Sequence, residues 1–129
     1  MAIKIAGTTV IDDSRNLTAC RFTTSVITAA STNAVVGNIY LVNATAGVRT
    51  IVLPTASLVV GDTIIVKDYK NNSETNNITV DPGVTYKIEA GSAGVDHIIA
   101  NNGDCLTFVW DGVDTWAIVN QLYGKAIYA

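Results

Sequence analysis

The sequence predicts an all-β protein: an antiparallel β-sandwich or barrel preceded by an extended N-terminal β arm. Valine, isoleucine and threonine contribute 16, 14 and 16 of the 129 residues. Such β-branched side chains lose rotamer freedom in helices and pack well on pleated surfaces. Short apolar runs alternate with turn sequences, as in chains of short strands. No segment combines helical apolar spacing with helix caps, so no helix is expected.

Residues 38–129 are predicted to form the β module, with strands recurring about every 8–12 residues as in sandwiches and barrels. Alternation places Leu106, Phe108 and Trp110 on one face of their strand. Asn102-Gly103 is a signal for a tight hairpin. The expected strands cover residues 38–43, 48–54, 62–69, 78–83 (a short strand closed by Asp-Pro-Gly), 84–90, 96–100, 105–111 and 115–120.

Residues 1–37 are predicted to form an extended arm and a linker into the module. They are rich in strand-forming residues but show no clear hairpin and no partner strand of their own. An isolated extended segment cannot bury both of its faces, so we expect it to pair with another chain. The apolar residues predicted to be buried between chains are Ile3, Ile5, Val10, Ile11 and Leu17.

The balance of charged and apolar residues also points to contacts between chains. Charged residues make up 15% of the sequence and apolar residues 49%, whereas about 25% charge is typical of soluble domains. No apolar run approaches the ~18 residues of a membrane-spanning helix, and the start has no signal-peptide core, so cytoplasmic synthesis without membrane insertion is expected. The net charge of −3 without a Lys/Arg cluster argues against nucleic-acid binding.

The most concentrated group of functional side chains is Asp-Asp-Ser-Arg at residues 12–15. On a strand, Asp12 and Asp13 would point to opposite faces, and Ser14 has no histidine nearby in sequence. Aspartate, serine and asparagine satisfy local backbone groups in turns. We therefore predict a turn here rather than a chemical site.

No catalytic residue, metal site or cofactor is predicted. His97 is the only histidine, and a catalytic triad or a zinc site would need further groups around it. The glycines form no phosphate-binding loop. Cys20 and Cys105 are expected to be buried thiols in a reducing compartment, with a disulfide as the alternative. The protein is therefore predicted not to be an enzyme.

Trp110 and Trp116 lie on two predicted strands near the C-terminus. Tryptophans in such positions serve as core or subunit-interface anchors. They can also form an exposed platform on which a sugar stacks, so a possible ligand platform for a host surface glycan remains an alternative.

Several stretches resemble structural proteins of tailed bacteriophages, including cyanophages. "IKIAGTTVIDDSRNLTA" is similar to repeated stretches in tail fibres and other virion proteins. "NIYLVNATAGVRTIVLP", "GDTIIVKDYKNNSETNNITV" and "CLTFVWDGVDTWAIV" resemble β-rich modules of the same proteins. The resemblance covers about 80% of the chain. The chain differs from these proteins in length, because such fibres are usually long and begin with a virion-docking domain.

The resemblance implies a component of the virion, commonly a homotrimer, with no catalytic residues. One arm and one module suit a capsid decoration (cement) protein that contacts the major capsid protein and stabilises the shell. The alternative is a small tail-fibre, neck or head-fibre component, with or without receptor or carbohydrate binding. Rivals of other classes are a carbohydrate-binding module and a glycan hydrolase, which would need two carboxylates facing one cleft.

Overall fold

The computed structural model describes residues 3–5, 8–11 and 22–122, and the side chains of residues 22–120. All regular structure in these residues is β-strand, which confirms the all-β prediction. The strands are β1 (Ile3–Ile5), β2 (Thr8–Ile11), β3 (Thr23–Ile27), β4 (Ser31–Asn33), β5 (Asn38–Val42), β6 (Arg49–Val52), β7 (Thr63–Asp68), β8 (Ile78–Asp81), β9 (Lys87–Ile88), β10 (His97–Ile99), β11 (Cys105–Trp110) and β12 (Thr115–Leu122).

The chain from β3 to β8 winds through three coils, and each coil gives one strand to each of two sheets. β3, β5 and β7 lie side by side and parallel in one sheet. β4, β6 and β8 do the same in the other. This is the arrangement of a short β-solenoid, in which successive coils stack on one another. The expectation of an antiparallel sandwich is therefore corrected, because both sheets are mixed.

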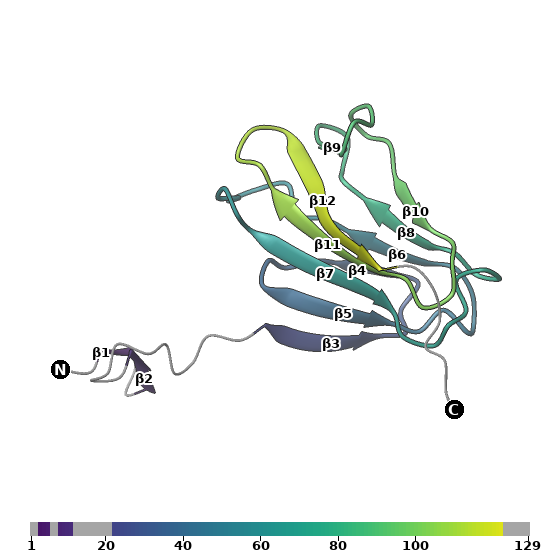
Figure 1. Ribbon diagram of the computed structural model, residues 1–129, viewed down its shortest axis with the longest axis horizontal. Coiled ribbons are helices and arrows are strands. Elements are labelled where there is room, and N and C mark those ends of the chain that lie inside the picture. The colour runs from purple at the N-terminus through teal and green to yellow at the C-terminus, as the bar shows by residue number, and fades with distance from the viewer. Residues whose placement is uncertain (1–2, 6–7, 12–21, 123–129) are drawn as a thin grey trace.

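Antiparallel strands complete the two sheets after the third coil. β11 pairs antiparallel with β7, β12 pairs antiparallel with β11, and β9 then pairs parallel with β12. In the second sheet β10 pairs antiparallel with β8. The resulting orders are β3-β5-β7-β11-β12-β9 and β10-β8-β6-β4. Figure 1 shows the larger sheet in front of the smaller one, with β3 and β4 on the same side of the stack.

One apolar core fills the space between the sheets. On β7 and β11 every second side chain is buried, as period-two alternation predicts. Ile64, Val66, Leu106 and Phe108 are all fully buried and lie in the same cluster as Ile51 of β6. The face predicted to hold Leu106, Phe108 and Trp110 is therefore the inward face of β11.

Part of the predicted arm belongs to the module. β3 and β4, which lie within residues 1–37, pair in register with β5 and β6 of the same chain. Residues 23–33 therefore have partner strands in cis and form the first coil. The earlier strands β1 and β2 pair antiparallel with each other, with Ile3 opposite Ile11.

The Asn102-Gly103 turn does not close a hairpin. It follows β10 in the smaller sheet and leads into β11 in the larger sheet, so it crosses between sheets. Gly103 has a φ of 81°, a conformation that glycine adopts without steric cost. The same backbone feature serves a sheet crossing as well as a two-residue hairpin, which explains why the sequence signal was misleading.

Candidate interaction surfaces

The residues predicted to lie between chains fall at the N-terminus. Ile3 and Ile5 belong to β1, and Val10 and Ile11 belong to β2. Leu17 and the Asp12–Arg15 stretch lie outside the described residues. The prediction that these side chains are buried between chains stays a prediction.

Trp110 and Trp116 lie in the core, with exposed fractions of 3% and 0%. Their ring centroids are 5.4 Å apart, and Tyr86 packs against Trp110 at 4.6 Å. Neither indole ring presents a face on which a sugar could stack. The structure thus corrects the ligand-platform alternative and places both residues among the core anchors.

The outer edge of β3 is a clear candidate for pairing with another strand. Thr23 N–H donates to Gly37 O (3.0 Å), and Ile27 O accepts from Asn43 N–H (2.8 Å). Backbone groups of alternate strand residues point to opposite sides. Thr24 and Val26 therefore direct their N–H and C=O groups away from β5. Among the strands that the structure describes, β3 pairs only with β5.

This edge lacks the features with which proteins usually protect exposed strands. No Asp, Glu, Lys, Arg or His occurs between Arg21 and Arg49, and the β3–β5 register is regular. Protected edges usually carry charge, proline or a bulge, or are very short. β3 is five residues long, and its Val26 is 58% exposed. Such an edge favours addition of a strand from another chain.

Asp68 stabilises the loops at the end of the coil stack where β7 ends. Its carboxylate is fully buried. Its Oδ2 accepts backbone N–H bonds from Asn72 (2.9 Å), Ser73 (3.0 Å) and Gly103 (3.0 Å). The Ser73 hydroxyl lies 2.8 Å from Oδ2 and 2.7 Å from Asn101 O, and it can donate to one of them. One carboxylate thus joins the loop after β7 to the loop before β11.

Hydrogen bonding determines the charge state of Asp68. Burial raises its pKa, but the backbone donors of Gly103, Ser73 and Asn72 and the Ser73 hydroxyl together outweigh burial and hold the pKa below 3.8. The carboxylate therefore remains ionised at neutral pH. Through its Oδ2, this charged carboxylate fixes the two loops relative to each other.

The remaining candidate side chains, those of His97 and Cys105, are both partly buried in the fold. His97 begins β10 and packs edge-on against Phe108 at 6.2 Å; burial lowers its pKa, and nearby Glu89 and Asp104 partly oppose that effect. Cys105 is a half-buried free thiol whose pKa is raised by burial, and Cys20 lies outside the described residues. Within residues 22–120, no group of three or more potential ligand side chains could hold a metal ion.

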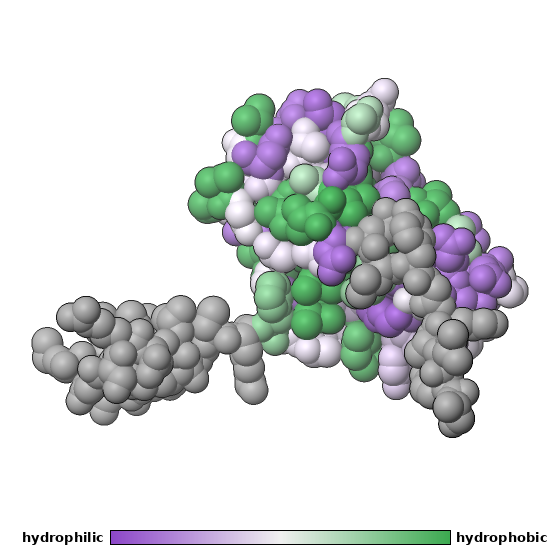
Figure 2. Space-filling model, viewed as in Figure 1, coloured by the Kyte–Doolittle hydropathy of each residue, from purple (hydrophilic) through white to green (hydrophobic). Residues whose placement is uncertain are grey.

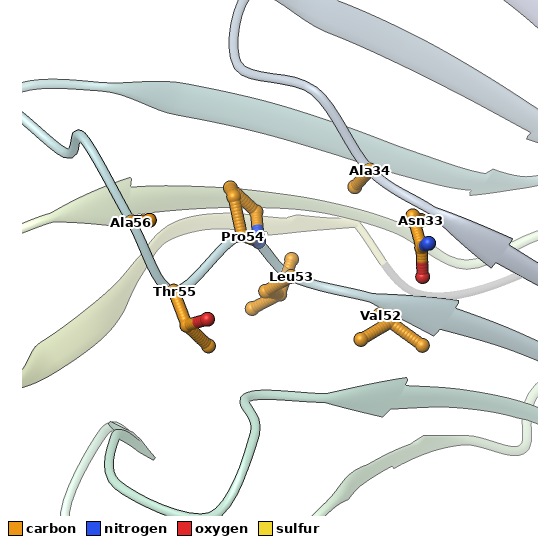
Figure 3. Close-up of a pocket in the computed structure, with 7 residues that line it drawn as sticks. All are labelled: Asn33, Ala34, Val52, Leu53, Pro54, Thr55 and Ala56. Carbon is orange, nitrogen blue, oxygen red and sulfur yellow. The ribbon is translucent and has the colours of Figure 1, made fainter.

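A hollow of about 360 Å³ opens where β4 and β6 end. Figure 3 shows Leu53 and Pro54 between Ala34 on one side and Thr55 on the other. Leu53 is 1% exposed and forms part of the core. The hollow is lined by Asn33, Ala34, Val52, Leu53, Pro54, Thr55 and Ala56. Its lining combines apolar side chains such as Val52 and Pro54 with the polar side chains of Asn33 and Thr55.

Comparison with known proteins does not place the chain in a family. No protein-family model matches it, and no curated protein sequence matches it. In the described part of the chain, no helix has the length and apolar character needed to cross a membrane.

Proposed function

We propose that the protein is a non-enzymatic structural component of a tailed-phage virion. More specifically, the proposed role is that of a homotrimeric capsid decoration protein. It stabilises the shell through strand pairing and apolar burial between subunits. The observation that carries the proposal is the exposed, uncharged outer edge of β3. The resemblance of several stretches to phage virion proteins supplies the biological setting and the trimeric state.

The mechanism is strand addition to an open edge. A strand from a neighbouring subunit that lies against β3 accepts and donates the outward hydrogen bonds of Thr24 and Val26, and it removes the exposed edge. Permanent assemblies usually bury about 2,000 Å² or more. Each buried apolar Å² contributes about 25 cal/mol before entropy costs. The neighbour's N-terminal strands, with Ile3 and Ile5, are the proposed source of that added strand.

A structural role also fits the polar groups that sequence alone leaves open. The Asp68 carboxylate joins two loops, the two tryptophans fill the core, and His97 packs on Phe108. These contacts favour a scaffold in which polar groups stabilise the fold. Placement on the tail fibre, neck or head fibre, with or without glycan binding, is the alternative within the same class.

Immunogold electron microscopy of purified phage particles tests the location. Decoration of capsids in a regular pattern is the expected result, with the major capsid protein as the contacting partner. Label confined to tails or neck would favour the alternative. Particles without label, combined with absence of the protein from their mass spectra, would overturn the proposal.

Placing a charge on the open edge should separate the subunits. Val26→Lys is expected to raise the concentration needed for association by at least about tenfold, because a lysine on an edge strand opposes strand addition. Val119→Lys is the matched control, since Val119 is 62% exposed on β12 of the same sheet. Sedimentation velocity provides the measurement, and circular dichroism checks folding. An unchanged assembly of folded Val26→Lys protein would contradict this use of the edge.

A further inference from the structure

Five loops meet at one end of the coil stack, and we call this surface the loop face. Strand directions bring them together: β4, β6, β8 and β11 end here, and β5, β7, β9, β10 and β12 begin here. Gly37 N–H donates to Thr63 O (2.8 Å), and Tyr86 Oη donates to Thr55 O (3.4 Å). The loops cover residues 34–37, 53–62, 82–86, 89–96 and 111–114.

Exposed apolar side chains concentrate on the loop face. Of the thirteen exposed large apolar residues among residues 22–120, eight lie here and two lie at the opposite end. Val84, Val113 and Val60 are 90%, 77% and 69% exposed. Seven of the eight lie in the loops, and the eighth, Phe22, directly precedes β3, which begins at the same end because it runs parallel to β5. The seven are Val35, Val36, Val59, Val60, Val84, Val95 and Val113. Surface apolar residues scattered singly need no explanation, but a group gathered on one end indicates an interaction site.

Each loop sets a valine beside or near a glycine. The sequences are "VVGN", "VVGD", "PGVT", "AGVD" and "DGVD". Gly112 and Gly94 have positive φ values of 91° and 73°, and an added Cβ would lie 3.0 Å from Val60 and 3.5 Å from Val84. The glycines thus allow the loops to approach one another closely. In Figure 2, hydrophobic residues appear at the left-hand end, near the β11–β12 turn, whereas hydrophilic residues dominate the loop projecting at the right.

The charges around these valines are mainly negative. The face carries the carboxylates of Asp62, Asp81, Glu89, Asp96, Asp111 and Asp114. Among the described residues of this face the only basic side chain is Lys87, which forms an ion pair with Asp114 at 3.3 Å. Hydrogen bonds from the backbone N–H groups of Val113 and Thr115 lower the pKa of Asp111, so this carboxylate is ionised at neutral pH.

This charge pattern distinguishes between two possible occupants. Two copies meeting loop face to loop face would bring like charges together, and such contacts oppose association. A partner with an apolar centre and a rim of lysine or arginine would match both the valines and the aspartates. The hollow beside Leu53 lies at the same end and can receive an apolar side chain from that partner.

We propose that the loop face is the docking site for a different protein whose contact surface is apolar at its centre and basic at its rim. The inference rests on the proposed function in one respect, because there the partner is a virion protein. Subunits then associate through the β3 edge while the loop face contacts the shell. The β3 edge is altered at Val26 and the loop face at Val60, Val84 and Val113, so each surface can be changed without a substitution in the other.

Titration of the ¹⁵N-labelled full chain with two synthetic peptides tests the chemistry without virions. One peptide alternates leucine and lysine, and the matched peptide alternates leucine and glutamate. The Leu/Lys peptide is expected to shift the amides of Val60, Val84 and Val113, with an affinity that falls as salt rises. The Leu/Glu peptide should produce no such shifts.

Variants make the test specific. Combined replacement Val60→Ser, Val84→Ser and Val113→Ser should weaken binding of the Leu/Lys peptide by at least about tenfold. The control variant combines Val48→Ser, Ile98→Ser and Val119→Ser, three exposed apolar residues outside the loop face. It should bind the Leu/Lys peptide within about twofold of wild type, because a few interface anchors carry most of the affinity. Val84→Ser alone provides a milder variant if the triple variant folds poorly.

Several outcomes would overturn the proposal: no binding, equal binding of both peptides, or shifts confined to another surface. Movement of the same loop-face amides when the protein alone is concentrated would show that a second copy occupies the face, and this too would overturn it. Because the titration contains no particles, its failure is distinguishable from failure of the proposed virion function, which the immunogold experiment tests.

Discussion

Replacing Asp68 by alanine is expected to lower the free energy of unfolding by about 3 kcal/mol or more. The change removes the acceptor of three backbone N–H groups, those of Asn72, Ser73 and Gly103. Each buried donor left without a partner costs about 1–3 kcal/mol. The loss is large against the 5–15 kcal/mol of total stability typical of a domain. Urea unfolding at a fixed subunit concentration provides the measurement.

The same carboxylate predicts an acid sensitivity. Its folded pKa is lower than the ordinary value of 3.8, so its contribution is complete above that value and is lost as pH falls through the folded pKa. Wild-type stability should therefore decline below about pH 4, and Asp68→Asn should show a flatter decline. Ser73→Ala serves as the control that removes one hydroxyl and keeps the carboxylate. Equal acid profiles for wild type and Asp68→Asn would contradict this role.

Trp116→Ala is expected to cost about 3–5 kcal/mol, the range for large aromatic residues in cores. Trp116 is fully buried and packs against Trp110 at a centroid distance of 5.4 Å. Its indole Nε1 is buried and makes no hydrogen bond to the described residues. Trp116→Phe should therefore cost much less than Trp116→Ala, because it keeps an aromatic ring and loses no hydrogen bond.

Chemical unfolding of Trp116→Ala, Trp116→Phe and Val119→Ala measures how much the Trp116 ring contributes to the free energy of unfolding. Val119→Ala, on the exposed face of the same strand, should change stability by no more than about 0.5 kcal/mol. A Trp116→Ala variant as stable as Val119→Ala would show that the ring is not an anchor of the core. Similar large losses for Trp116→Phe and Trp116→Ala would show that the indole nitrogen matters after all.

The strands and their inward faces were predictable because both depend on local sequence. The expected ranges 38–43 and 62–69 became Asn38–Val42 and Thr63–Asp68. Period-two alternation along a strand selects one face for burial whatever its neighbours are. This is why the face predicted to hold Leu106, Phe108 and Trp110 is a buried face in the structure.

The partner of each strand was not predictable from the same signals. β5 lies between β3 and β7, and its sequence neighbour β6 lies in the other sheet. A turn of glycine and small polar residues fits a hairpin and a sheet crossing equally well, and only long-range burial decides between them. For this reason the sequence predicts an antiparallel sandwich or barrel where the structure has parallel coils, and it predicts an arm that includes residues 23–33.

Two features, the buried Asp68 and the valines of the loop face, have signals in the sequence itself. Asp68 follows Ile64 and Val66 at two-residue spacing and therefore lies on the same inward face of β7. An aspartate at such a position indicates a buried hydrogen-bond network. The valines at positions 60, 84 and 113 each adjoin a glycine, but each looked like an ordinary turn. Only the fold shows that these loops share one end of the molecule.

Assembly of this chain with copies of itself through its open first coil is the basis of the proposed function. Light scattering coupled to size-exclusion chromatography, at micromolar concentration and neutral pH, measures the mass directly. A homotrimer of about three times the chain mass of 13.6 kDa is expected. A stable species with the mass of one chain would contradict it and would favour a monomeric binding module.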